Sequence, residues 1–125
     1  LRGRREGCGV GVCGSCTVLV DGRPVSSCLM LAINAEGKEI CTIEGLAPGD
    51  ELDPVQQAFL EQSAFQCGYC TTGMIMATKA LLGSNPNPTE EEVRDYLSGN
   101  ICRCGTYQEV IAAIKSLCEK NPSRV

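Results

Sequence analysis

Histidine and tryptophan are absent from this chain of 125 residues, and aromatic residues make up only 4% of it. Without histidine the chain cannot form a zinc finger of the Cys/His type, and it has no imidazole for acid–base chemistry. Because aromatic side chains are so few, a small core must be built from aliphatic residues or around an inorganic group. No apolar run approaches the roughly 18 residues that cross a bilayer, so we expect no membrane span.

An excess of positive charge is also lacking. The net charge is −4 and no cluster of lysine and arginine offsets it, which argues against a nucleic-acid partner. The chain begins at Leu1 with no methionine and no secretory signal, so we expect a cytoplasmic protein whose N-terminal elements are missing. Export of the folded chain together with a partner is the alternative. The length suits one domain or two very small ones.

The abundant residue is cysteine, of which the chain has ten. Disulfides lack their usual secretory context here, which leaves zinc and iron–sulfur chemistry as the alternatives. In the stretch GCGVGVCGSCTVLVDGRPVSSC, the spacing of Cys8, Cys13 and Cys16 is C-x4-C-x2-C, and Cys28 follows. This is the spacing of plant-type [2Fe–2S] ferredoxins, whereas zinc sites usually pair two C-x2-C motifs. The glycines between these cysteines let the loop turn its backbone N–H groups toward an anionic cluster.

A second set of four cysteines lies in the later part of the chain. Cys67 and Cys70 form a C-x2-C hook, and Cys102 and Cys104 form a C-x-C hook. Each hook directly precedes a predicted helix, whose N-terminus favours an anion. Structural zinc or a dithiol redox motif is the alternative, but a thioredoxin-like motif would require a βαβ context that is missing. The repeated order of helix, hook and helix predicts two helical hairpins related by a pseudo-twofold axis, with a second cluster between them.

Cys41 and Cys118 remain outside both sets, and we expect them to be small buried hydrophobic residues.

The period of the apolar residues changes along the chain. The first third predicts strands over 16–20 and 23–25, joined by an Asp21-Gly22 turn, and further short strands over 28–32 and 39–43. A turn-rich connector over 45–50 then leads into a helical part.

Four helices are predicted in that second part. The first begins after the N-cap Asp53, the second spans 72–82 and ends at Gly83, the third follows a capping box at 89–92 and ends at Gly99, and the fourth begins near Thr106. Their apolar faces are predicted to contain Val55, Phe59, Leu60, Met74, Ile75, Thr78, Leu81, Leu82, Tyr107, Val110, Ile111, Ile114 and Leu117.

Five stretches together resemble the small iron–sulfur subunit of the molybdenum hydroxylases, the family of xanthine dehydrogenase, aldehyde oxidoreductases and aerobic carbon monoxide dehydrogenase. They are EGCGVGVCGSCTVLVDGRPVSSC, TIEGLA, QCGYCTTGMIM, NPNPTEEEV and LSGNICRC. The resemblance implies an α+β fold in which a β-grasp ferredoxin-like module, truncated here, occupies residues 1–47. A four-helix [2Fe–2S]-binding module would occupy residues 48–125.

The resemblance also implies roles for individual residues. The cluster on Cys8, Cys13, Cys16 and Cys28 would be distal to molybdenum, and the cluster on Cys67, Cys70, Cys102 and Cys104 would be proximal. Gln66 and Cys104 match the positions that contact molybdopterin in the family, whose expected form is the cytosine dinucleotide. The amide and the sulfur could each form hydrogen bonds with the pterin.

Two departures from the common family pattern concern the electron acceptor. This chain has Cys70-Thr-Thr-Gly73 where many members have CTPG, and Cys102-Arg-Cys-Gly-Thr-Tyr107 where many have CRCTGY. The Gly-Thr order resembles a branch with isoquinoline, nicotinate and some aldehyde dehydrogenases, several of which use a cytochrome or quinone in place of a flavin subunit.

The leading hypothesis is therefore a non-catalytic electron-transfer subunit of an oxidoreductase. A large subunit would hold molybdenum, and a medium subunit would hold FAD unless a cytochrome or quinone is the acceptor. A free-standing ferredoxin-like carrier and a zinc-binding interaction module are the alternatives.

Overall fold

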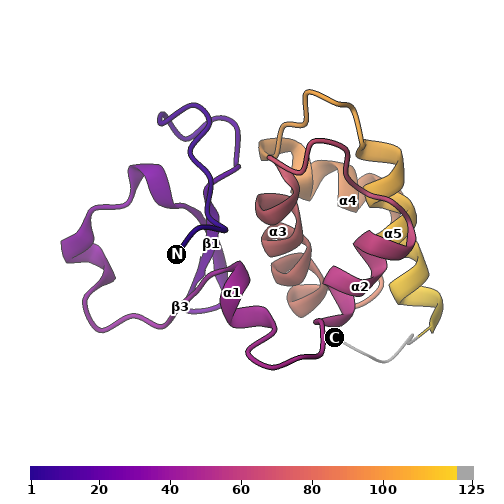
Figure 1. Ribbon diagram of the computed structural model, residues 1–125, viewed down its shortest axis with the longest axis horizontal. Coiled ribbons are helices and arrows are strands. Elements are labelled where there is room, and N and C mark those ends of the chain that lie inside the picture. The colour runs from indigo at the N-terminus through magenta and orange to yellow at the C-terminus, as the bar shows by residue number, and fades with distance from the viewer. Residues whose placement is uncertain (121–125) are drawn as a thin grey trace.

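The computed structural model describes residues 1–120 and contains a small sheet beside a group of helices (Figure 1). Within these residues, no helix combines the length and the apolar character needed to cross a membrane. The elements in chain order are β1 (Thr17–Val20), β2 (Arg23–Ser26), the 3-10 helices η1 (Ser27–Leu29) and η2 (Ala32–Ala35), β3 (Ile40–Cys41), α1 (Ile43–Leu46), α2 (Pro54–Glu61), α3 (Thr71–Ser84), α4 (Glu90–Tyr96), the 3-10 helix η3 (Leu97–Gly99) and α5 (Tyr107–Lys120).

The sheet is antiparallel, with β1 between β2 and β3. All four residues of β1 are buried, as expected for its apolar and β-branched sequence. Asp21 and Gly22 both adopt positive φ, at 49° and 78°, as a tight two-residue hairpin turn requires, so the predicted hairpin is confirmed. One face of the sheet packs on α3 through Leu19, Met76 and Ala80.

The helix α3 occupies the centre of the molecule, between the sheet and the other helices (Figure 1). Most of its residues are therefore buried, including the predicted positions Met74, Ile75, Thr78, Leu81 and Leu82. Its outer side packs with α2, α4 and α5 in a second, larger core.

Two capping boxes begin helices where the sequence predicts them. The Asp53 carboxylate accepts a hydrogen bond from the Val55 N–H at 2.9 Å, and the same carboxylate pairs with Lys79 of α3 at 2.6 Å. Thr89 caps α4 in the same manner by accepting from the Glu92 N–H. The first cap also attaches the start of α2 to α3 through the ion pair.

Several predicted elements are wrong in detail. Residues 28–32 form no strand, because their apolar side chains have no core to cover: Leu29 and Leu31 are more than 60% exposed on a path through η1 and η2. Only Ile40–Cys41 of the predicted strand 39–43 pairs with β1. The helix α1 begins at the last residue of that predicted strand and continues into the predicted connector.

Three further differences concern the helices. The second helix continues past Gly83 to Ser84, since nothing at that glycine forces the helix to end. Leu60 is 51% exposed, because α2 turns Val55, Ala58 and Phe59 inward instead. Tyr107 is 39% exposed, although the rest of the predicted face of α5 is buried or half-buried. Residues 121–125 of the predicted helical module lie outside the described residues.

Candidate metal centres

The first cysteine loop follows a path that favours glycine at three points, Gly9, Gly11 and Gly14. Gly11 and Gly14 have φ of 77° and 74°, in the left-handed region. A Cβ on Gly11 would lie 2.3 Å from Cδ1 of Leu29, so η1 covers the loop closely. A Cβ on Gly14 would lie 2.4 Å from the carbonyl oxygen of Gly99, shortly before the C-x-C hook.

This loop directs backbone N–H groups at the sulfur of Cys8. The N–H groups of Val10, Val12 and Cys13 donate to Cys8 Sγ at 3.4, 3.3 and 3.4 Å. These hydrogen bonds lower the pKa of Cys8 to about 6, which favours the thiolate that binds metal.

Cys16 and Cys28 lie close together. The Cys28 N–H donates to Cys16 Sγ at 3.5 Å. Burial works to raise the pKa of Cys16, but hydrogen bonds from the Cys28 backbone and thiol outweigh it and lower this pKa. Burial raises the pKa of Cys28, and the charges of Cys16 and Cys8 raise it further. The Cys13 thiol also forms a hydrogen bond that lowers the pKa of Cys8. All four predicted ligands are thus close enough to influence one another, and Cys16 ionises before Cys28.

The second set shows the same arrangement at the starts of α3 and α5. Cys102 is buried, and its sulfur accepts from the Thr106 N–H at 3.5 Å and lies 3.2 Å from the Thr106 hydroxyl. Burial opposes ionisation, but these contacts and the Cys70 thiol lower the pKa of Cys102 to about 7. The pKa of Cys70 rises to about 12, first through burial and then through Cys102 and the charge of Cys67.

The remaining predicted residues of this site are more accessible. Cys67 and Gln66 are exposed, and Cys104 is half-buried against the helical core. Within residues 1–120, neither Gln66 nor Cys104 forms a side-chain hydrogen bond through which it would be held in place. The structure therefore brings Cys67, Cys70 and Cys102 together, while Gln66 and Cys104 lie beside them without a fixed partner in the described part of the chain.

Hydrogen-bond donors surround the sulfurs of both cysteine sets, as an anionic cluster requires. Among the described residues, no group of three or more cysteine or acidic side chains converges closely enough to hold a metal ion. A [2Fe–2S] cluster divides four thiolates between two irons, and hydrogen bonds to its sulfurs stabilise it. The N–H groups around Cys8 and the Thr106 contacts of Cys102 supply such donors.

The two cysteine sets meet along a tight seam. The Ile101 N–H, directly before Cys102, donates to the carbonyl oxygen of Cys13 at 2.9 Å. The Asn100 side chain donates to the Gly14 carbonyl at 3.2 Å, from a position that is 8% exposed. A Cβ on Gly73 of α3 would lie 2.3 Å from that same carbonyl oxygen. Sequence spacing gave no indication of this seam, because it joins segments far apart in the chain.

The N-terminal segment also bridges the two sets. The Tyr69 hydroxyl, inside the C-x2-C hook, donates to the Glu6 carbonyl at 2.6 Å. The Arg5 guanidinium lies 5.5 Å from the centroid of the Tyr69 ring, and the Thr72 hydroxyl donates to the Gly3 carbonyl at 2.8 Å. The residues that lead into the first loop are thereby fixed to the start of α3.

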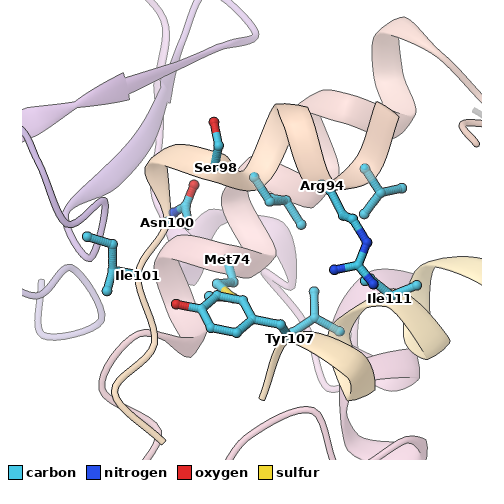
Figure 2. A pocket seen from close by; sticks show the side chains of 10 residues that line it. Met74, Arg94, Ser98, Asn100, Ile101, Tyr107 and Ile111 are labelled. Atoms are coloured by element: carbon cyan, nitrogen blue, oxygen red, sulfur yellow. The ribbon is translucent and has the colours of Figure 1, made fainter. Parts of the chain in front are cut away.

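Thr106 and Tyr107 are functional neighbours of Cys102 that the sequence reasoning missed. The Tyr107 hydroxyl accepts from the Cys102 N–H at 2.7 Å and donates to the Cys102 carbonyl at 3.3 Å. Figure 2 shows this ring on the wall of a cavity of about 260 Å³, near Met74 and Ile101 and opposite Arg94. The position of both residues just after the C-x-C hook was the available signal, because the start of a helix turns back toward the residues before it.

Cys41 and Cys118 are half-buried, Cys41 beside the β1–α3 core and Cys118 beside the helical core. Burial raises the pKa of each thiol, in keeping with the predicted packing role. None of the ten cysteines, all of which are described, forms a disulfide.

The fold and the clustered thiols define an iron–sulfur protein, and the family model described as a [2Fe–2S] binding domain matches residues 42–115. The chain is 49% identical over 116 residues to the nicotinate dehydrogenase small FeS subunit of Eubacterium barkeri, covering 93% of this chain and 74% of that protein. A nicotinate dehydrogenase subunit of Pseudomonas putida is 48% identical over 119 residues, with coverage of 95% and 76%.

Comparison with solved structures leads to the same family as the sequence relatives. Quinoline 2-oxidoreductase from Pseudomonas putida 86 superposes with a TM-score of 0.91 at 46% identity, over 100% of this chain and 79% of that one. The aldehyde oxidoreductase from Desulfovibrio desulfuricans superposes with a TM-score of 0.90 at 40% identity over 98% of this chain, which spans 14% of that chain. The chain belongs to the family of small iron–sulfur subunits of the molybdenum hydroxylases. It is an electron-transfer subunit of an oxidoreductase complex, not a free ferredoxin.

Proposed function

We propose that this chain holds two [2Fe–2S] clusters and conducts electrons from a molybdopterin centre to FAD or another acceptor. Cys8, Cys13, Cys16 and Cys28 would hold the distal cluster, and Cys67, Cys70, Cys102 and Cys104 the proximal one. Each cluster, when bound, accepts and releases one electron at a time. The observation that best supports this function is the seam, where the Ile101 N–H contacts the Cys13 carbonyl and so joins the two sets through a single hydrogen bond.

The protein contributes position and electrostatics. Backbone N–H groups stabilise the negative charge on the sulfur of Cys8, and Thr106 does the same for Cys102. Tyr107 fixes the backbone of Cys102 in place. These contacts restrict the motion of the ligands, which favours electron transfer with little rearrangement.

We further propose a division into two modules. Residues 1–47 would form the ferredoxin-like part, of the β-grasp type, and residues 48–125 the helical part, with pseudo-twofold symmetry between its two hairpins. The order of α2, hook and α3 followed by α4, hook and α5 supports that symmetry.

A large molybdenum-binding subunit is the proposed partner at the proximal cluster. Gln66 and Cys104 would contact the molybdopterin there, in its cytosine dinucleotide form, and the exposure of Gln66 supports that role. A medium FAD-binding subunit is the proposed acceptor, with a cytochrome or quinone as the alternative. We propose a cytoplasmic location, with export of the folded chain together with a partner as the alternative.

Substrate choice is not expected to lie in this chain. Relatives of 46–50% identity are named for nicotinate, nicotine and aldehyde oxidation. Such different substrates with similar iron–sulfur subunits favour a substrate site in the large subunit.

The test is the complex purified under oxygen protection, with Cys28→Ser, Cys102→Ser and the control Cys41→Ser. The unaltered chain should hold about four irons and four acid-labile sulfides and give two distinct paramagnetic signals when reduced. Cys28→Ser should remove or alter one signal and Cys102→Ser the other, while Cys41→Ser keeps both. An iron-free chain that binds zinc, or loss of both signals in each variant, would refute two independent clusters.

A further inference from the structure

Arg4 is fixed beside the first cysteine loop by a chain of two hydrogen bonds. Its Nε donates to the Ser27 hydroxyl at 2.8 Å, and that hydroxyl donates to the Cys16 carbonyl oxygen at 2.8 Å. The guanidinium therefore lies within two hydrogen-bond lengths of the Cys16 backbone. Because Ser27 directly precedes Cys28, the positive charge lies next to two of the proposed ligands.

The charge of Arg4 is not neutralised by a neighbouring acid in the described chain. Within residues 1–120, no carboxylate lies within ion-pairing distance of Arg4, and the ion pairs that form there involve other cations. The closest acid in sequence, Glu6, directs its carboxylate toward Gly9 instead. Arg4 and Ser27 are both half-buried and Cys16 is 2% exposed, so solvent screens this charge only in part.

The neighbouring arginines are placed differently. Arg5 lies over the Tyr69 ring, and the Arg2 side chain is exposed with no hydrogen bond to residues 1–120. Arg4 is thus the arginine of this segment that is anchored at the first loop. The anchor suits arginine better than lysine, since a planar guanidinium can donate from Nε and keep its remaining N–H groups in a fixed direction.

Resting on the proposed function, we propose that Arg4 raises the reduction potential of the cluster held by Cys8, Cys13, Cys16 and Cys28. Reduction adds one electron to this cluster, supplied by the partner centre or by an added reductant, and neither makes nor breaks a bond. A fixed positive charge at short range stabilises the more negative reduced state. The potential of the cluster near Cys102 should be much less affected, because Arg4 is held beside Cys16 and Ser27 and the effect of its charge weakens with distance.

The experiment is a redox titration of the purified, cluster-loaded complex, followed by electron paramagnetic resonance. The variants are Arg4→Gln, Arg4→Lys and Ser27→Ala, and Arg2→Gln is the matched control with the same change of charge in the same segment. Iron and sulfide analysis establishes loading, and Cys102→Ser identifies which signal belongs to which cluster.

In Arg4→Gln, the ratio of reduced to oxidised distal cluster at the original midpoint potential should fall at least threefold. In Arg4→Lys this ratio should fall less, because lysine keeps the positive charge. In Ser27→Ala it should also fall, because Arg4 loses its anchor. Arg2→Gln should leave the ratio unchanged.

Two results would overturn the proposal while leaving the proposed function intact. One is a loaded Arg4→Gln complex in which the potential of the distal cluster is unchanged. The other is a shift in potential that is equal for both clusters, or that Arg2→Gln produces to the same extent. If Arg4→Gln loads no cluster, the comparison of Ser27→Ala with Arg4→Lys decides: unchanged ratios in both would refute the role of Arg4. A complex without iron in the unaltered protein would instead refute the proposed function itself.

Discussion

Gly73 provides a severe test of the seam between the two cysteine sets. It is the third residue of α3, and a Cβ there would lie 2.3 Å from the Gly14 carbonyl oxygen and 3.1 Å from Cα of Ser15. Both contacts are with backbone, so no side chain can rotate away. The change Gly73→Ala must therefore move the first cysteine loop or the start of the helix.

Two opposing terms set the size of the effect. Helix propensity favours alanine over glycine by about 1 kcal/mol. Overpacking costs about 1–3 kcal/mol, and loss of the hydrogen bonds from Asn100 and Ile101 to the loop costs about 0.5–1.5 kcal/mol each. The steric term wins, and we expect Gly73→Ala to destabilise the protein by about 3 kcal/mol.

The same helix offers a matched control. Gly83 lies in the last turn of α3, and a Cβ there would meet nothing within 4 Å. We expect Gly83→Ala to be neutral or to stabilise by up to about 1 kcal/mol. The assay is thermal unfolding of the cluster-loaded complex at a fixed scan rate, followed by circular dichroism and by bleaching of the visible absorption.

Gly73→Ala should lower the apparent Tm by roughly 5–15 °C and broaden the paramagnetic signals of both clusters. Gly83→Ala should leave both unchanged or raise the Tm slightly. If the two variants behave alike, the close approach of α3 to the first loop is refuted.

Three further predictions concern other contacts. Asp53→Ala should cost about 1–2 kcal/mol, more than Lys79→Met, because it removes a helix cap as well as an ion pair, as measured by the shift in Tm. Tyr69→Phe should cost about 1 kcal/mol, because it loses only the hydroxyl's hydrogen bond to the N-terminal segment, and an unchanged Tm would contradict this. The hydrogen bond from Lys115 is the main cause that lowers the pKa of Glu90 to about 2 in the folded state. The stabilisation by the ionised Glu90 carboxylate is therefore present above the unfolded-state pKa and lost on acidification. The difference in stability between the unaltered chain and Glu90→Gln should be constant at neutral pH and shrink as the pH falls below about 5.

Local signals in the sequence predicted the elements that depend on neighbouring residues. The Asp21-Gly22 turn and the cap at Asp53 appear where the sequence indicated them, because each is formed by residues a few positions apart. The strand predicted over 28–32 failed for the opposite reason. An apolar run becomes a strand only if another element covers it, and in this structure Leu29 and Leu31 remain exposed.

The candidate metal centres likewise combine features that cysteine spacing predicts with contacts that it does not. Cysteine spacing predicts two sets of four thiols, because the number of residues between ligands limits how they can surround a small cluster. Spacing could not identify Thr106 as a donor to Cys102, nor Ser27 as the link between Arg4 and Cys16. These contacts depend on how the loops close.

Residue types and their spacing predict the chemistry of this protein: which side chains can ionise, how they group along the chain, and which helices begin beside them. The contact between the two groups is visible only in the folded chain, where the Ile101 N–H meets the Cys13 carbonyl and Gly73 of α3 lies against the first loop. The two kinds of feature differ in the range over which they act. Spacing and caps act over a few bonds along the chain, whereas contact between distant segments depends on the complete packing of the sheet against α3.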